Sequence, residues 1–185
     1  MDTIISDLEN TKAIVIDLRF NQGGKDEVGL EILGHFITQK TKIASKKARY
    51  LSGFTNEQSI YIEPRKPFYS KNLYILTSHM TASAAEVATI GSLAIDNATR
   101  IGSLTEGILS DGLDKKLPIG WFYTLSNEIY TERKGNNYER IGIPPNIDLN
   151  YNEDRAIMLN GILEELETNG DRSIEEVIAI EGKNN

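Results

Sequence analysis

The sequence predicts an α/β fold in one domain. Strand–loop–helix units recur along its 185 residues, and no repeat period indicates a solenoid. Two continuous apolar runs, Lys12–Leu18 and Leu73–Thr77, are typical of strands that are buried on both faces. An apolar share of 39% is sufficient for a hydrophobic core. A chain of this length suits one domain, alone or with an appendage.

The first half of the chain alternates predicted helices and strands. Apolar residues recur at helical spacing in some segments, and β-branched residues gather in others. Pro64 and Pro67 mark a loop that leads into the second buried strand. The predicted elements are a helix over about 3–10, a strand over 12–18, a helix over 28–38, and more exposed strands over 42–50 and 59–63.

The second half continues the pattern and ends in helices. A hairpin is expected between Leu117 and Thr131, with Ser126, Asn127 and Glu128 interrupting its apolar pattern. Ile143-Pro-Pro-Asn is a rigid extended segment, since proline fixes φ. The other predicted elements are a strand over 73–77, a helix over 83–96, a return to the sheet at 100–102, a helix over 157–166 and a short helix that begins at Ser173.

Charge divides the chain into a core and an extension. From Tyr151 onward there are nine acidic and three basic residues, a balance of −6 within the net charge of −7. We therefore expect residues 1–150 to form the core and residues 151–185 an acidic helical extension with a solvated face. The negative charge argues against a nucleic-acid partner. No apolar run is long enough for a membrane span, and the first residues lack the pattern of a signal peptide.

The sequence indicates neither a metal nor another cofactor. It contains no cysteine, and its two histidines, His35 and His79, have no partner at ligand spacing. His35 falls in an amphipathic helix and is interpreted as a structural residue. His79 precedes Ser83 by four positions, so a role as a catalytic base would require an unusual turn.

Met80–Glu86, Met-Thr-Ala-Ser-Ala-Ala-Glu, is the most informative stretch. It places Ser83 between an apolar strand and an alanine-rich helix. Ser83 and Glu86 match a capping box, which has no chemical function. A helix N-terminus also presents free N–H groups and a partial positive charge, which suit a serine nucleophile. The local sequence leaves both interpretations open.

A second glycine-rich loop follows the first buried strand. Gly23, Gly24 and Gly29 do not match the spacings of nucleotide-binding motifs. Glycines at this point permit a tight turn and leave N–H groups exposed, as an oxyanion donor requires. Sites in open α/β sheets form at the carboxyl ends of strands. We therefore expect the loops 19–25 and 78–83 to meet there.

Taken together, these segments resemble the tail-specific, or C-terminal-processing, serine peptidases, a family that includes the tricorn core and the repeats of interphotoreceptor retinoid-binding protein. The resemblance spans about Ala13–Leu149 and implies a crotonase-like (ClpP/crotonase) spiral core. It implies Ser83 as the nucleophile, with N–H groups of Ala84 and of Gly24 or Gly23 as the oxyanion hole. The matching stretches, in order, are Ile16–Gly24, Leu76–Glu86, Ile101–Gly107, and Leu117–Trp121 through Gly142–Ile147.

The catalytic base departs from the family pattern. Many members have a lysine directly after Thr-x-Gly, but Ile108 stands there in this chain, and Lys115 and Lys116 lie further on. The tricorn-like branch uses a histidine oriented by a glutamate, which Glu139 matches. Its histidine comes from a segment before the first strand, and no histidine precedes Asp17 here. We therefore expect residues 1–150 to be a catalytic core without the usual N-terminal part.

The leading hypothesis is a serine-type endopeptidase core that acts on a peptide or protein substrate through an acyl-enzyme. The sequence leaves open whether this core associates with further copies of itself or with a missing N-terminal segment. The alternative is a non-catalytic module that binds a peptide or an apolar ligand in a cleft near Trp121 and Phe122. An acyl-thioester enzyme ranks third, because Glu86 is better explained as part of the helix cap.

Overall fold

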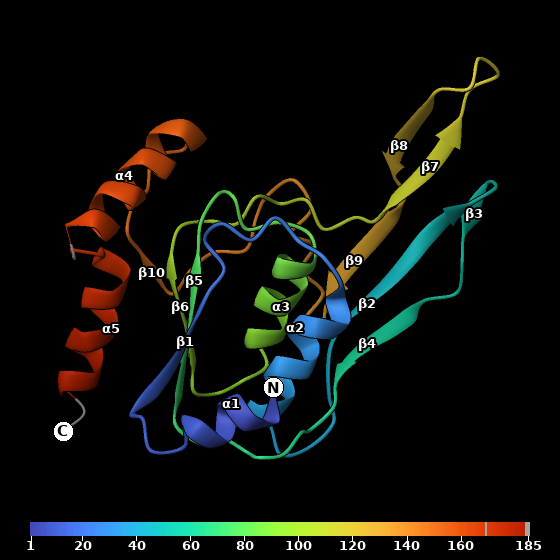
Figure 1. Cartoon of the computed structure of the whole chain (residues 1–185). Coiled ribbons are helices and arrows are strands. Elements are labelled where there is room, and N and C mark those ends of the chain that lie inside the picture. The colour runs from blue at the N-terminus through green and yellow to red at the C-terminus, as the bar shows by residue number, and fades with distance from the viewer. Residues whose placement is uncertain (169, 184–185) are drawn as a thin grey trace.

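A parallel sheet of four strands forms one layer of the computed structural model, which describes residues 1–168 and 170–183. Its strand order is β1-β5-β6-β10 (Figure 1). Strands β1 and β5 confirm the two buried strands that the apolar runs predicted. They are parallel neighbours, so the loops that follow them leave from the same edge of the sheet. The bounds are β1 (Ala13–Asp17), β5 (Asn72–Thr77), β6 (Ala98–Gly102) and β10 (Ile147–Asp148).

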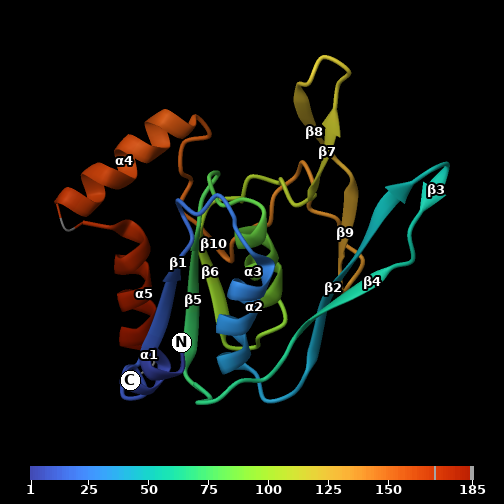
Figure 2. The same ribbon diagram turned by 45° about the vertical axis from the view of Figure 1, so that its right-hand side comes forward.

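Two helices separate this sheet from a second, antiparallel sheet (Figure 2). One buried cluster contains Ile75 of the first sheet, Ile90 of the helical layer and Ile43 of the second sheet. The predicted α/β class is therefore confirmed. The elements are α2 (Asp26–Leu33), a 3₁₀ turn (Gly34–Phe36), α3 (Ala84–Ser92), β2 (Thr41–Tyr50), β3 (Gly53–Phe54), β4 (Gln58–Ile62) and β9 (Glu128–Glu132).

The central helix α3 is buried along its whole length, and its sequence explains how this is possible. All of its residues are buried, and most are small. It ends at Ser92, earlier than the predicted Asp96. Gly29 of α2 lies against Ala88 of α3, where a Cβ on the glycine would come within 2.7 Å of the alanine Cβ. Small side chains thus let the two helices pack closely between the sheets.

The hairpin near Trp121 differs from its prediction. Strand β7 (Gly112–Lys116) pairs with β8 (Phe122–Ser126), and the chain then crosses into β9 of the second sheet. Figure 1 shows the β7–β8 hairpin projecting from the body. Trp121 is 71% exposed and Phe122 70% exposed. These rings therefore offer an open surface, not the walls of the ligand cleft that the sequence analysis expected.

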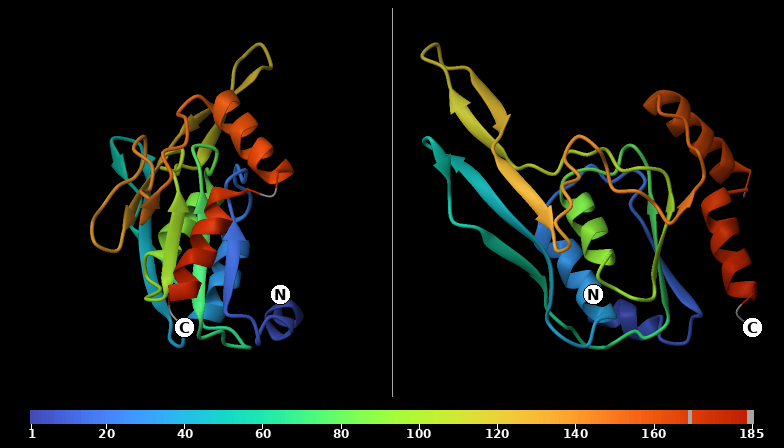
Figure 3. Two further views of the ribbon diagram at one scale, coloured as in Figure 1. Left: turned by 90° about the vertical axis from the view of Figure 1, so that its left-hand side faces the viewer. Right: turned by 180° about the vertical axis from the view of Figure 1, so that it is seen from behind.

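The acidic extension packs against the body through one face and exposes charged residues on another. It contains α4 (Arg155–Glu167) and α5 (Arg172–Lys183). Val177 of α5 is buried against Tyr74 and Leu76, on the sheet face that α2 and α3 leave uncovered. A count of acidic residues does not reveal this packing, because the inward residues of α5 are apolar and its charged residues lie mostly outward. Figure 3 shows these helices and the β7–β8 hairpin at opposite sides.

A short helix, α1 (Asp2–Asp7), precedes β1. In residues 1–168 and 170–183, no helix has the length and apolar character of a membrane span.

We expect Gly29→Ala to destabilise the fold by about 1–3 kcal/mol, because the new methyl group would collide with Ala88 at the α2–α3 contact. Alanine normally favours a helix by up to about 1 kcal/mol over glycine. The steric clash with Ala88 must therefore outweigh this preference for the substitution to destabilise the fold. Gly161 of α4 has open space at its Cβ position, and Gly161→Ala is the matched control, expected to stabilise. Urea unfolding measures both changes. A Gly29→Ala protein as stable as the parent would contradict the packing.

Candidate active site

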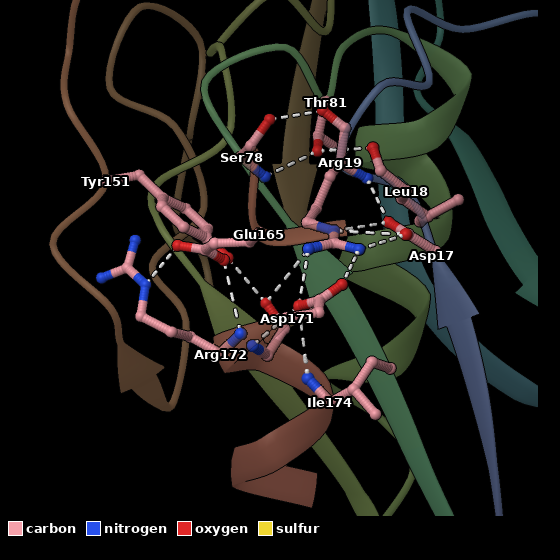
Figure 4. Close-up of polar contacts among 11 residues, drawn as sticks. Asp17, Leu18, Arg19, Ser78, Thr81, Tyr151, Glu165, Asp171, Arg172 and Ile174 are labelled. Carbon is pink, nitrogen blue, oxygen red and sulfur yellow. Dashed lines mark hydrogen bonds and ion pairs between the residues drawn. The ribbon is translucent and has the colours of Figure 1, made fainter. Parts of the chain in front are cut away.

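The loops that follow β1 and β5 meet at the sheet edge, as the sequence predicted. Thr81 Oγ1 donates to the carbonyl of Leu18 at 2.8 Å, and Ala82 N–H donates to the carbonyl of Asn21 at 3.1 Å. The Ser78 hydroxyl donates to the carbonyl of Arg19 (Figure 4). Side-chain hydroxyls of one loop thus hold the backbone of the other.

Ser83 occupies the turn between β5 and α3 in a strained conformation. Its φ is 55° and its ψ is −125°, a region that residues with a side chain rarely adopt. Its side chain makes no capping hydrogen bond, and its N–H donates to the carbonyl of Ile108 at 2.9 Å. The hydroxyl is therefore not used to cap the helix. Strain at a strand-to-helix turn is a feature of exposed serine nucleophiles.

The carboxylate of Glu86 binds mainly to a segment that lies about twenty residues further along the chain. Glu86 is fully buried in α3, and its carboxylate reaches forward to the segment 105–108. It accepts hydrogen bonds from Thr105 Oγ1 at 2.5 Å and from the N–H groups of Gly107 and Ile108 at 2.8 Å each. Burial raises the pKa of Glu86, although these hydrogen bonds oppose the rise. The Ser83 hydroxyl makes no capping bond, so a full capping box is not formed, although the backbone of Ser83 also helps to lower the pKa of Glu86.

Gly23 lies directly against Ser83. A Cβ on Gly23 would come within 2.7 Å of Ser83 Cβ and 3.0 Å of Ser83 Oγ, and its φ of +119° also favours glycine. Its N–H donates to Asn21 Oδ1 at 2.9 Å. Gly24 and Ala84 differ: within the described residues, no hydrogen-bond acceptor is recorded for either N–H. Of the expected oxyanion donors, these two have their N–H groups available.

An apolar cavity of about 250 Å³ opens beside these groups. Its walls come from β1, β5, α2, α3 and the loop after β1, and it includes Gly23, Gly24 and Ala84. Ile16, Val28 and Ile32 contribute aliphatic surface. The cavity is therefore shaped for an apolar side chain next to Ser83.

Glu139, the other expected site residue, is half-buried behind the segment 108–110. Its Oε2 accepts hydrogen bonds from the N–H groups of Leu109 and Ser110 at 2.8 and 2.9 Å. The carbonyl of Ile108 in turn accepts the N–H of Ser83. Glu139 is thus linked to Ser83 through a short backbone segment, with its Oε1 atom outside these hydrogen bonds.

The described part of the chain brings no base to Ser83. His35 is buried, and its Nδ1 lies 2.8 Å from the carbonyl of Pro67. His79 has no hydrogen bond to Ser83 among the described residues. Lys115 and Lys116 are exposed on the β7–β8 hairpin. Nor do the described residues group three side chains that could hold a metal ion.

Sequence reasoning missed one more residue of this site, Thr105. Its hydroxyl donates to Glu86 and accepts the N–H of Ile143 at 2.7 Å. Thr105 and Glu86 therefore join the helix of Ser83 to the Gly-Ile-Pro-Pro segment. The sequence signal for this pair was that Glu86 and Thr105 lie in two successive stretches that resemble the peptidase family.

Comparisons with known proteins agree with this geometry. The family model for peptidase family S41 matches residues 1–149. A protein from Parabacteroides merdae ATCC 43184, described as a candidate peptidase, has a TM-score of 0.81 at 19% identity and covers 97% of this chain. The photosystem II D1 C-terminal processing protease has a TM-score of 0.64 at 20% identity over 80% of the chain. The tricorn protease has a TM-score of 0.60 at 18% identity over 93% of the chain.

These structural neighbours confirm the crotonase-like fold. They are longer than this chain, which spans 55%, 36% and 15% of their respective lengths. The likeness at this level of identity concerns the fold alone.

We expect Glu86→Gln to destabilise the protein by about 1–3 kcal/mol. Glutamine has the same shape, but its NH₂ group must face a backbone N–H of Gly107 or Ile108 where an acceptor stood. Glu31→Gln on the exposed side of α2 is the control and should be nearly neutral. Chemical denaturation compares the free energies of unfolding. Equal losses in the two variants would contradict the role of Glu86.

Proposed function

The chain belongs to peptidase family S41, and on that premise we propose that it is a serine peptidase core with Ser83 as the nucleophile. The observation that carries the proposal is the placement of Ser83. Its hydroxyl is free of capping bonds at a strained turn, beside the uncommitted N–H groups of Gly24 and Ala84. Family membership and the peptidase neighbours support a peptidase core.

The proposed reaction is acyl transfer. Ser83 Oγ attacks the carbonyl carbon of a peptide bond while a base removes its proton, and the carbonyl oxygen becomes an oxyanion. The N–H groups of Gly24 and Ala84 stabilise that oxyanion, assisted by the N-terminal dipole of α3. Collapse of this intermediate expels the amine, which takes up the proton, and leaves an acyl-enzyme. Water then releases the acid and restores Ser83.

The base is assigned to a histidine outside these 185 residues, oriented by Glu139. The supporting observations are that the described residues place no histidine or lysine in hydrogen-bond contact with Ser83, and that Glu139 has one oxygen outside its backbone hydrogen bonds. Without a base, Ser83 keeps its proton and reacts slowly. The isolated chain is therefore expected to be a weak peptidase.

The apolar cavity suggests the substrate preference. It lies against Gly23, Gly24 and Ala84, so a side chain next to the attacked carbonyl would enter it. The aliphatic walls disfavour a charged side chain, since its desolvation would go uncompensated. We propose cleavage after an apolar residue.

A fluorophosphonate probe tests the nucleophile. We expect Ser83 to be labelled slowly by the chain alone and faster when imidazole is added, because imidazole replaces the missing base. Mass spectrometry of the labelled peptide gives the site and the rate. Ser83→Ala is the control and should remain unlabelled. Absence of Ser83 labelling even with imidazole would reject the catalytic proposal and leave a non-catalytic binding module.

A larger side chain at Val28 tests the pocket. Val28 lines the cavity and is 56% exposed, so Val28→Phe should narrow the pocket without disturbing the core. Peptidyl phosphonates with a leucine or an alanine side chain next to phosphorus should react in the parent with at least about a ten-fold preference for leucine. In Val28→Phe this preference should fall. Glu31→Phe on the same helix, away from the cavity, should retain it, and an unchanged ratio in Val28→Phe would exclude this pocket.

A further inference from the structure

The C-terminal extension lies outside the segment that the family model matches, yet it contacts three separate parts of the candidate site. One contact is made at the end of β1, one at the loop that carries Ser83, and one at the segment that binds Glu86. These contacts are, in that order, Asp171 with Arg19, the cluster of Tyr151, Met158 and Ile162 with Met80, and Arg155 with Glu106.

The strongest of the three contacts is a buried ionic network around Arg19 (Figure 4). The Arg19 side chain is 2% exposed. Its Nη1 and Nη2 donate to the two oxygens of Asp171 at 3.0 and 2.7 Å, and its Nε and Nη2 donate to Asp17. The paired geometry fixes the plane of the guanidinium group.

Two opposing effects act on the charges of this network. Burial by itself lowers the pKa of Arg19 and raises the pKa of Asp171. Their mutual hydrogen bonds, together with those of Asp17, outweigh burial, so the pKa of Arg19 is raised and the pKa of Asp171 is lowered. Both groups are therefore charged at neutral pH. Removing one of them would leave its partner buried without full compensation.

Asp171 also fixes the start of α5. Its Oδ1 accepts the N–H of Ser173 at 2.9 Å, and the Ser173 hydroxyl lies 2.7 Å from Tyr151 Oη. One carboxylate thus caps a helix of the extension and binds the arginine that follows β1. The position of the extension and the position of Arg19 are coupled through this carboxylate.

Arg19 transmits that coupling to the site through its backbone. Its carbonyl accepts the Ser78 hydroxyl, and the neighbouring carbonyl of Leu18 accepts Thr81 Oγ1. Gly24 lies a few residues beyond Arg19, and Ser83 lies two residues beyond Thr81. A shift of Arg19 would therefore move both the oxyanion donor and the nucleophile.

The third contact reaches the loop that carries Ser83 through a different segment. Arg155 of α4 forms an ion pair with Glu106, whose N–H donates to the carbonyl of Thr81 at 2.9 Å. Glu106 stands between Thr105 and Gly107, the residues that bind Glu86. The extension therefore contacts the site through two separate segments.

We propose that the C-terminal extension is a positioning element of the active site, in which Asp171 acts through Arg19 on the loop 18–24 and Arg155 acts through Glu106 on the segment 105–108. The expected effect on catalysis rests on the proposed function. The claim that the extension holds these loops in place is independent of that function.

Asp171→Asn and Arg155→Met test the proposal in the full chain. Asparagine is also a good helix cap, so the first variant removes the charge of Asp171 but keeps a cap for α5. Arg155→Met removes an exposed ion pair and leaves the buried network intact. Glu175→Gln is the control, since it makes the same charge change on an exposed position of α5.

Amide hydrogen exchange measures the loops directly. We expect faster exchange in residues 18–24 and 78–84 of Asp171→Asn and in residues 104–108 of Arg155→Met, with α3 beyond its first turn unchanged and the control identical to the parent. Unchanged exchange in the loops would overturn the proposal. Equal acceleration throughout α3 and β5 would do the same, since it would indicate general destabilisation.

Labelling of Ser83 in imidazole measures the catalytic consequence. The maximal rate at saturating fluorophosphonate should fall at least about ten-fold in Asp171→Asn, with the half-saturating concentration retained, because misplacement slows the chemical step. Loss of folded protein alone would lower the labelled fraction and keep the rate. A parental rate in this variant would overturn the positioning role. Absence of labelling in the parent would reject the proposed function instead, and exchange would still decide whether the extension holds the loops.

Discussion

Hydrogen bonds between the loop after β1 and the loop after β5 fix the distance between the glycine turn and Ser83. The parallel sheet brings both loops to one edge, but it does not by itself fix the distance between them. Thr81 and Ala82 then bind the backbone of Leu18 and Asn21, and Gly23 packs on Ser83 with no room for a side chain. The strained backbone of Ser83 is tolerated because its neighbours are fixed on both sides.

A buried carboxylate extends the same constraint to the rest of the fold. Glu86 binds the segment 105–108 to the helix that begins after Ser83, and Thr105 passes the connection on to Ile143. Glu139 holds the next two residues of that segment. Most of the polar groups around Ser83 therefore position backbone, and they leave the hydroxyl and two N–H groups uncommitted. On our proposal, such a site is preorganised for an oxyanion.

Patterns within short stretches of sequence predicted those elements whose structure depends mainly on neighbouring residues. The strands β1 and β5 followed from apolar runs, and the meeting of their loops followed from strand direction. Only the Ser83 hydroxyl half of the capping box is absent, and most donors to Glu86 lie about twenty residues away. The packing of the extension could not be predicted, because Asp171 pairs with Arg19 across 152 residues, which no count of charges reveals. The resemblance implied Ser83, Ala84 and either Gly24 or Gly23, and only the coordinates show that the Gly23 N–H is bound to Asn21.

The central claim is that Ser83, Gly24 and Ala84 form one oxyanion-stabilising centre. A crystal structure of the chain after reaction with a peptidyl phosphonate tests it most directly, because the phosphoryl oxygen occupies the place of the oxyanion. The account predicts a bond from Ser83 Oγ to phosphorus, with that oxygen within about 3.1 Å of the backbone nitrogens of both Gly24 and Ala84. A phosphoryl oxygen directed to solvent, or held by groups other than these two, would contradict it.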